Sequence, residues 1–116
     1  MQSTLAVIPA RLGSTRFPRK VLYPWQERPL LWHVWDRVRR AKSVSRVVIA
    51  TDSAEIERAA CGFGAEVVRT SAQCATGSDR AAEAMRKVGG DIVVNIQGDN
   101  LLVSPSALDK VVNAMR

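Results

Sequence analysis

The sequence predicts an α/β fold, in which a mostly parallel sheet is covered by helices on both faces. Along the 116 residues, short runs of β-branched apolar residues alternate with segments whose apolar residues recur at helical spacing. This alternation is typical of parallel sheets that are buried on both sides. The composition, 47% hydrophobic and 24% charged residues, is that of a globular domain with its own core. We therefore expect residues 1–116 to form a single domain.

Four segments have the length and composition of buried strands. Each places two to four apolar residues in a row, and most of these residues are β-branched. The predicted strands are Thr4–Pro9 (TLAVIP), Arg46–Thr51 (RVVIAT), Ala65–Arg69 (AEVVR) and Asp91–Ile96 (DIVVNI).

Four helices are predicted to follow these strands. The first has apolar residues at helical spacing, and the next two begin at residues that cap helices and end before glycines. The last has a proline in its first turn, where the missing amide proton costs least. The helices cover Leu30–Lys42, Ser53 to about Cys61, Ser78 or Asp79 to about Val88, and Pro105–Met115.

The order of the elements predicts how the strands lie in the sheet. Crossovers between parallel strands are almost always right-handed, which makes 3-2-1-4, half of a Rossmann fold, the expected strand order. The first and fourth strands are then neighbours, and ligands bind where their carboxyl ends meet. Two loops should face each other there, Ala10–Lys20 and Gln97–Ser104.

The charge of the chain is concentrated in one segment. The net charge is +6, but residues 11–46 alone carry ten basic and two acidic residues, so the remainder sums to −2. A basic segment of this kind predicts an anionic partner, which could be a nucleotide, a nucleic acid or an acidic membrane surface.

Other features narrow the class of protein. No apolar run approaches the ~20 residues that cross a bilayer, and no basic segment precedes the apolar N-terminus as in a secretory signal. Cys61 and Cys74 have no metal-type spacing, so we expect reduced thiols and a cytoplasmic location.

The segment Pro9–Lys20 (PARLGSTRFPRK) has the composition of a phosphate-binding loop. Gly13 allows a tight turn, while hydroxyls, amides and the cations Arg11, Arg16 and Lys20 can neutralise phosphate oxygens. It is neither a P-loop nor a GxGxxG motif, which argues against a standard dinucleotide-binding domain. A basic surface loop is the alternative, and the position after the first strand favours the phosphate site.

Two further segments carry candidate ligand-binding residues. In NIQGDN, residues 95–100, Asp99 is placed to hold Mg²⁺ and Gln97 to contact a base or a sugar, although Asp99 could also serve only as a turn residue. In TGSDR, residues 76–80, Ser78 is either a helix cap or a residue near the nucleotide base.

Four motifs occur in order along the chain: IPARLGSTRFPRKVL, ATDS, TGSDR and VNIQGD. Together they resemble the 3-deoxy-manno-octulosonate (Kdo) cytidylyltransferases, also called CMP-Kdo synthetases. The first motif also resembles the cytidylyltransferases of spore-coat polysaccharide synthesis, but TGSDR and QGD favour the Kdo type. The resemblance spans nearly the whole chain and about half of the family's length. It implies a three-layer α/β/α, Rossmann-like nucleotidyltransferase domain, truncated to the N-terminal, nucleotide-binding half.

The resemblance implies transfer of a cytidylyl group from CTP to Kdo or a similar acidic sugar, with Mg²⁺ and release of pyrophosphate. At the matching positions, Arg11, Ser14, Arg16 and Lys20 would hold the triphosphate, Gln97 with Ser78 or Arg80 would lie near the cytosine and ribose, and Asp99 would hold the metal. Arg11, Lys20 and Asp99 would act in catalysis. The chain departs from the family pattern after Asp99 and on both sides of Lys20.

Three hypotheses of different classes follow. The favoured one is an enzyme that uses CTP and an acidic sugar, acts as a homo-oligomer and binds neither nucleic acid nor membrane. The second is a catalytically incompetent nucleotide-binding fragment or an assembly module. The third, a nucleic-acid-binding module, requires the basic residues on one face, whereas those of the predicted helix 30–42 spread around it.

His33, Trp32 and Trp35 are interpreted as structural residues. No serine, cysteine or second histidine is placed to form a catalytic group with His33, so it should lie packed or on the helix surface. The two tryptophans are expected to pack in the core or at an interface.

Overall fold

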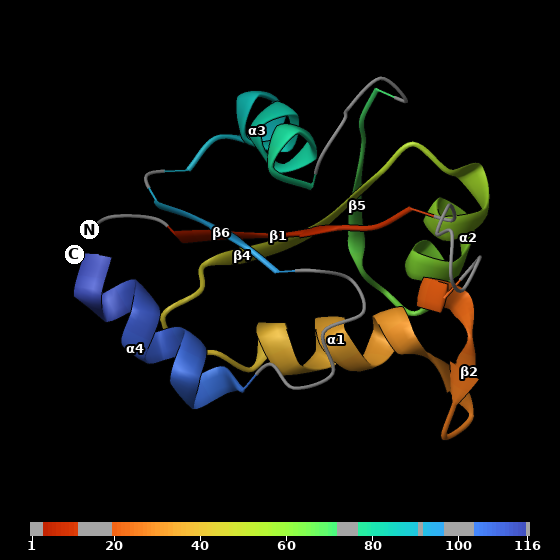
Figure 1. The fold of residues 1–116 in the computed structure, drawn as a ribbon, viewed down its shortest axis with the longest axis horizontal. Helices are drawn as coiled ribbons and strands as arrows, with labels where there is room; N and C mark the ends of the chain where they lie inside the picture. The colour runs from red at the N-terminus through yellow and green to blue at the C-terminus, as the bar shows by residue number, and fades with distance from the viewer. Residues whose placement is uncertain (1–3, 12–19, 72–76, 91, 97–103, 116) are drawn as a thin grey trace.

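A four-stranded parallel sheet forms the middle layer of the protein (Figure 1). The computed structural model describes residues 4–11, 20–71, 77–90, 92–96 and 104–115. The strands are β1 (Thr4–Pro9), β4 (Arg46–Thr51), β5 (Glu66–Arg69) and β6 (Ile92–Asn95), in the order β5-β4-β1-β6. This is the order 3-2-1-4 of the four predicted strands, so the predicted topology is confirmed.

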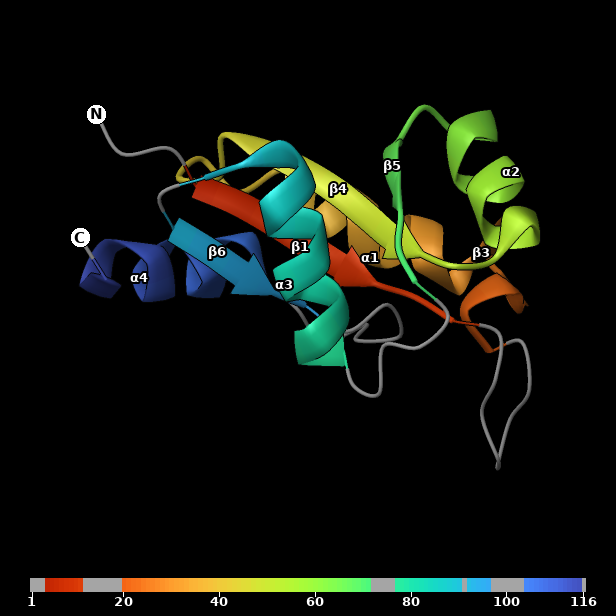
Figure 2. The ribbon, with the colours of Figure 1, turned by 90° about the horizontal axis from the view of Figure 1, so that it is seen from above.

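The sheet is buried because helices cover both of its faces (Figures 1 and 2). The helix α3 (Gly77–Val88) lies on one face, and α1 (Leu30–Arg39) and α4 (Pro105–Met115) lie on the other. The remaining helix, α2 (Ala54–Gly62), follows β4 and packs into the same core as α1. The predicted α/β/α layering is therefore confirmed.

All six residues of β1 are buried, because this strand lies between two others and under helices on both faces. Successive side chains of a strand point to opposite faces, so β1 contributes to two cores. Leu5 and Val7 pack with Ala81 and Ala84 of α3. Ala6 and Ile8 belong to the larger cluster under α1, α2 and α4. This explains why the run TLAVIP is continuously apolar after its first residue instead of alternating.

The helix α1 ends at Arg39, three residues before the predicted end at Lys42. The next amides bond three residues back, Arg40 N to Arg37 O at 3.2 Å and Ala41 N to Val38 O at 3.1 Å. The amide of Lys42 and the amide and hydroxyl of Ser43 then donate to the carboxylate of Asp109 on α4. A tertiary contact thus satisfies the amides that would have continued the helix.

These hydrogen bonds make Asp109 a pH-dependent link between α4 and the segment after α1. The Ser43 hydroxyl first, and then the Ser43 amide, lower the pKa of Asp109 below its ordinary value. A group with a lowered folded-state pKa stabilises the protein above its unfolded pKa, about 3.9 for aspartate, and loses that contribution as the pH falls through the folded value. We expect Asp109→Asn to lower the melting temperature at neutral pH and to leave it nearly unchanged in acid. The control Lys110→Gln alters an exposed neighbouring charge, and an equal pH dependence of Asp109→Asn and the parent in thermal melts would contradict the assignment.

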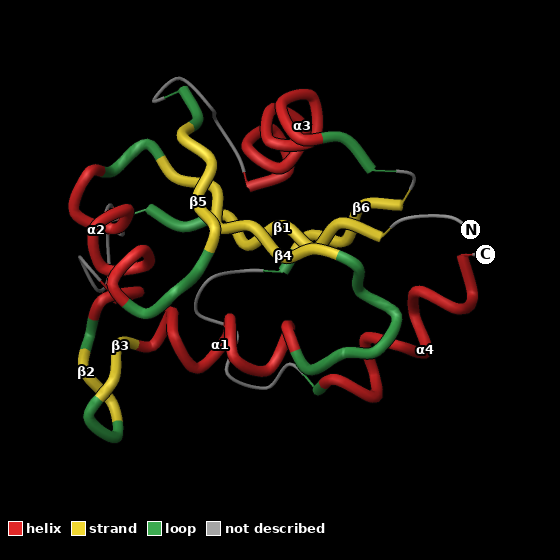
Figure 3. Tube along the Cα trace, turned by 180° about the vertical axis from the view of Figure 1, so that it is seen from behind, coloured by secondary structure: helices red, strands yellow, loops and turns green. Residues whose placement is uncertain are grey.

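A small hairpin precedes α1 and was not predicted from the sequence (Figure 3). After a single turn of 3-10 helix at Lys20–Leu22, the strands β2 (Pro24–Trp25) and β3 (Arg28–Pro29) pair antiparallel. The turn residues Gln26 and Glu27 have φ values of 50° and 69°. Two-residue hairpin turns with positive φ usually carry Asn-Gly or Gly, so a Gln-Glu turn has no signal in the sequence.

The aromatic residues around α1 serve packing, as predicted. Trp35 lies 5.1 Å from the ring of Phe63 and borders the main core. His33 is half-buried, and its Nε2 lies 2.6 Å from the carbonyl oxygen of Trp25. The guanidinium of Arg28 stacks 4.5 Å above Trp32, which is half-buried. The more exposed aromatic side chains are Tyr23 and Trp25, at 50% and 38%.

Part of the basic surplus is neutralised locally. Arg39 and Arg40 reach the carboxylate of Asp36 at 2.6 and 2.9 Å, while their own side chains are 49% and 66% exposed. This agrees with the prediction that the basic residues of this helix form a solvated surface. None of the helices in the described ranges combines the length and the apolar character that crossing a membrane requires.

Candidate functional site

The carboxyl ends of β1 and β6 lie side by side. The strands are in register from Thr4 opposite Ile92 to Val7 opposite Asn95, and Ile96 N donates to Val7 O at 2.9 Å just beyond the last pair. We call this end of the two strands, residues 9–11 and 95–96, the β1/β6 edge. It is the place at which parallel α/β sheets bind ligands.

Two of the predicted ligand-binding residues come to this edge. Ala10 N donates to Ala50 O at 2.9 Å and extends the pairing of β1, so Arg11 leaves directly from the strand and is exposed. Ser78, in the first turn of α3, is also exposed, and its Oγ lies 3.5 Å from Nδ2 of Asn95 at the end of β6. A cation and the amino end of a helix on one edge are suited to an anionic ligand.

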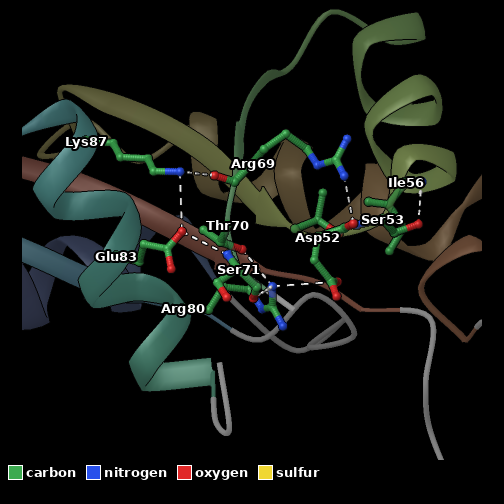
Figure 4. A network of polar contacts seen from close by, with 10 residues as sticks. Asp52, Ser53, Ile56, Arg69, Thr70, Ser71, Arg80, Glu83 and Lys87 are labelled. Atoms are coloured by element: carbon green, nitrogen blue, oxygen red, sulfur yellow. Dashed lines mark hydrogen bonds and ion pairs between the residues drawn. The ribbon is translucent and has the colours of Figure 1, made fainter. Parts of the chain in front are cut away.

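Arg80, the third predicted residue in this region, points into the protein (Figure 4). It is only 5% exposed, and its Nη1 donates to Oγ1 of Thr70 at 2.6 Å and to the carbonyl oxygen of Ser71 at 3.4 Å. The same nitrogen lies 3.6 Å from Oδ1 of Asp52. Arg80 therefore joins α3 to the segments that follow β4 and β5.

Further polar contacts fasten α3 to the end of β5 (Figure 4). Glu83 accepts from the amide of Ser71 at 2.8 Å, and Lys87 donates to the carbonyl oxygen of Arg69 at 2.6 Å. Lys87 and Glu83 are also paired at 3.3 Å. Arg80, Glu83 and Lys87 are spaced three and four residues apart, so they share one face of the helix.

The segment Thr51–Ser53 organises the end of β4. The Ser53 hydroxyl accepts from Ile56 N at 3.2 Å, which confirms the predicted cap of α2. Ser53 N in turn donates to Oγ1 of Thr51 at 3.1 Å, and the Asp52 carbonyl oxygen accepts from Arg69 Nη2 at 2.9 Å. The hydrogen bond from Arg69 thus joins the carboxyl ends of β4 and β5.

Sequence reasoning gave no role to Asp52, Thr70 and Asn95. Each is a polar residue at or directly after the end of a strand, and this common position could have identified them as candidate site residues. Their partners could not have been read from the sequence, because Asp52 and Thr70 meet Arg80 only through the packing of α3.

The other predicted site residues lie outside what the structure describes. Ser14, Arg16, Gln97 and Asp99 fall in the ranges 12–19 and 97–103, and for Lys20, the first residue of the 3-10 turn, only the backbone is described. Within the described part of the chain, no three His, Cys, Asp or Glu side chains are grouped so that they could hold a metal. The assignment of these residues remains a prediction.

The three layers, the strand order and the polar residues at the carboxyl ends of the strands define a Rossmann-like α/β fold. Residues 5–116 match the cytidylyltransferase family, and the chain belongs to this family. The resemblance to CMP-Kdo synthetases seen in the four motifs is confirmed by individual relatives.

Two curated relatives illustrate the match. The chain is 46% identical over 107 residues to 3-deoxy-manno-octulosonate cytidylyltransferase of Geobacter sulfurreducens, covering 92% of this chain and 43% of that protein. It is 40% identical over 114 residues to 8-amino-3,8-dideoxy-manno-octulosonate cytidylyltransferase of Shewanella sp., covering 96% of this chain and 46% of that protein. The chain thus spans less than half the length of these curated relatives.

A solved structure of CMP:2-keto-3-deoxy-manno-octonic acid synthetase complexed with CTP has the same fold. It superposes with a TM-score of 0.95 at 36% sequence identity, covering 98% of this chain and 47% of that one. The fold described here therefore corresponds to about half of that synthetase.

Proposed function

We propose that this chain carries the nucleotide-binding half of a cytidylyltransferase that activates Kdo or a similar acidic sugar for lipopolysaccharide or capsule synthesis. The observation that carries the proposal is the TM-score of 0.95 over 98% of the chain to a synthetase complexed with CTP. The four sequence motifs and the position of Arg11 and Ser78 at the β1/β6 edge support it.

In the proposed reaction, a hydroxyl oxygen of the sugar attacks the α-phosphorus of CTP. A bond forms between that oxygen and the α-phosphorus, and the bond from the α-phosphorus to the oxygen that bridges the α- and β-phosphates breaks. Pyrophosphate leaves with that oxygen, and the hydroxyl proton passes to solvent. Such a transfer depends on alignment and on neutralising phosphate charge more than on a covalent intermediate with the protein.

We assign the residues of the chain to three tasks in this reaction. Positively charged and hydroxyl groups of the loop after β1 hold the triphosphate, Gln97 and Ser78 lie near the cytosine and ribose, and Asp99 holds Mg²⁺, which would neutralise phosphate charge. The triphosphate residues are Arg11, Ser14, Arg16 and Lys20. Of the whole set, Arg11, Lys20 and Asp99 act in catalysis.

The proposal also covers the organisation of the protein. Residues 1–116 form one nucleotide-binding domain, the protein is cytoplasmic, and it forms a homo-oligomer. The outer strands of the described sheet, β5 and β6, and the exposed Tyr23 and Trp25 are the surfaces available for such assembly.

The first test of the nucleotide site is a thermal shift. A ligand at about 100 times its Kd stabilises the folded state by about 2.7 kcal/mol, which corresponds to about 10 °C or more for a domain of this size. We expect CTP with Mg²⁺ to raise the melting temperature, and Arg16→Ala to weaken binding by about 1.5–3 kcal/mol because a charge-assisted contact is lost.

Arg58→Ala is the matched control, since Arg58 is exposed on α2. It should leave the shift intact. If CTP, UTP, ATP and GTP all leave the melting temperature of the parent unchanged, the loop after β1 is only a basic surface loop.

The second candidate function applies to residues 1–116 acting by themselves, which span 43% to 47% of the length of the relatives described above. Such a protein would bind nucleotide without turning it over, or act as an assembly module. Turnover by a protein of residues 1–116 separates the two candidates.

A further inference from the structure

We propose that Arg80 is a positioning residue of the nucleotide site. From inside the protein, it sets the first turn of α3 against the ends of β4 and β5, and so holds Ser78 at the β1/β6 edge. The inference rests on the proposed function, because it assumes that a nucleotide binds at this edge.

The contacts of Arg80 are unusual for the first turn of a surface helix. Its side chain is 6% exposed, and one nitrogen, Nη1, meets Thr70, Ser71 and Asp52 at 2.6, 3.4 and 3.6 Å. Removing a guanidinium from water is costly unless its hydrogen bonds are made within the protein. The contacts to Thr70, Ser71 and Asp52 satisfy that requirement for Arg80.

Docking of α3 by itself does not require this arginine. Ala81, Ala84 and Val88 already pack on the sheet. Glu83 already binds Ser71 after β5, and Lys87 already binds Arg69 at the end of β5. Those contacts lie further along the helix. Arg80 makes its contacts in the first turn, where α3 begins.

The geometry of a helix links Arg80 to Ser78. Two residues are separated by about 200° around a helix, so side chains at these positions point to nearly opposite sides. Arg80 points toward the ends of β4 and β5, while Ser78 points toward Asn95 at the end of β6. The contacts of Arg80 on one side of the turn therefore also fix the position of Ser78, which faces the ligand on the other side.

Three variants isolate this role. Arg80→Met keeps a long unbranched side chain and removes the guanidinium, and Thr70→Val keeps the shape of the acceptor residue and removes its hydroxyl. Lys87→Met is the matched control, because it removes a contact from the same face of α3 to the end of β5, about two and a half turns away from Ser78.

The measurements are the Kd for CTP in the presence of Mg²⁺, by calorimetry at a temperature at which all variants are folded, and amide hydrogen exchange of α3. Because losing a hydrogen bond to a charged group costs roughly tenfold or more in affinity, we expect Arg80→Met to raise the Kd about tenfold. Thr70→Val should raise it less, and the double variant should bind no more weakly than Arg80→Met. Lys87→Met should leave the Kd within about twofold while lowering the melting temperature.

Hydrogen exchange locates the effect. The amides of residues 81–84 bond to the carbonyl groups of the first turn, so Arg80→Met should accelerate their exchange, whereas Lys87→Met should affect the last turn instead. If Arg80 contributes only to stability, Arg80→Met would lower the melting temperature, but its Kd for CTP would equal that of Lys87→Met.

The outcomes distinguish the two proposals. A parent protein that binds CTP, with Arg80→Met and Lys87→Met alike in Kd, would overturn the positioning role and leave the proposed function standing. A parent that binds no nucleoside triphosphate would overturn the proposed function and this inference with it. If Arg80→Met does not fold, an unchanged Kd in Thr70→Val decides against the role.

Discussion

A protein consisting of residues 1–116 alone is expected to bind CTP with Mg²⁺ but to form CMP-Kdo at least about 100-fold more slowly than a full-length relative. The physical reason is that the transition state needs nucleotide, metal and sugar held together, and a misplacement of about an ångström is enough for a loss of this size. The chain covers 43% of the Geobacter sulfurreducens relative, and the motifs it contains are assigned to the nucleotide rather than to the sugar.

The measurement is pyrophosphate release from CTP with Kdo or its 8-amino counterpart as acceptor, with light scattering on the same sample. The full-length Geobacter sulfurreducens enzyme is the positive control. Rapid formation of CMP-Kdo by a monodisperse monomer would contradict both the expected slow turnover and the proposed homo-oligomer. It would also remove the nucleotide-binding fragment as a candidate function.

The second large effect is expected for Asp99→Asn, which keeps the shape of the side chain and removes its charge. We expect the variant to fold, to bind CTP in the absence of Mg²⁺ as the parent does, and to gain nothing from added Mg²⁺. The loss corresponds to about 1.5–3 kcal/mol, the range for hydrogen bonds to charged groups, or roughly ten- to hundredfold in Kd. Hard cations such as Mg²⁺ require oxygen ligands, and a neutral amide oxygen is a weaker one than a carboxylate.

Asn100→Ala is the control for this experiment, because it alters the next residue and leaves the carboxylate of Asp99 in place. Titrations of CTP with Mg²⁺ and with EDTA separate the metal from the nucleotide. Should Asp99→Asn bind CTP with Mg²⁺ as tightly as the parent, Asp99 is only a turn residue.

Much of the fold could be predicted because local pattern and tertiary environment agree. The run TLAVIP is apolar because β1 is buried on both faces, and Ser53 caps α2 through a hydrogen bond only three residues long. The strand order follows from the handedness of the crossovers, which is a general property of parallel sheets. The predicted end of α1 was wrong because the amides of residues 42 and 43 bond to Asp109, which lies more than sixty residues away in the chain.

The class of fold, the family and the polar residues at the β1/β6 edge could be predicted from the sequence, because strands, caps and motifs depend on neighbouring residues. The position of the Arg80 side chain could be seen only in the folded protein. The family resemblance placed Ser78 or Arg80 near the cytosine and ribose, and in the folded protein the side chain of Arg80 lies inside, against Asp52 and Thr70. No local pattern encodes that arrangement, since it exists only when the sheet has brought the ends of β4 and β5 together and α3 has packed across them.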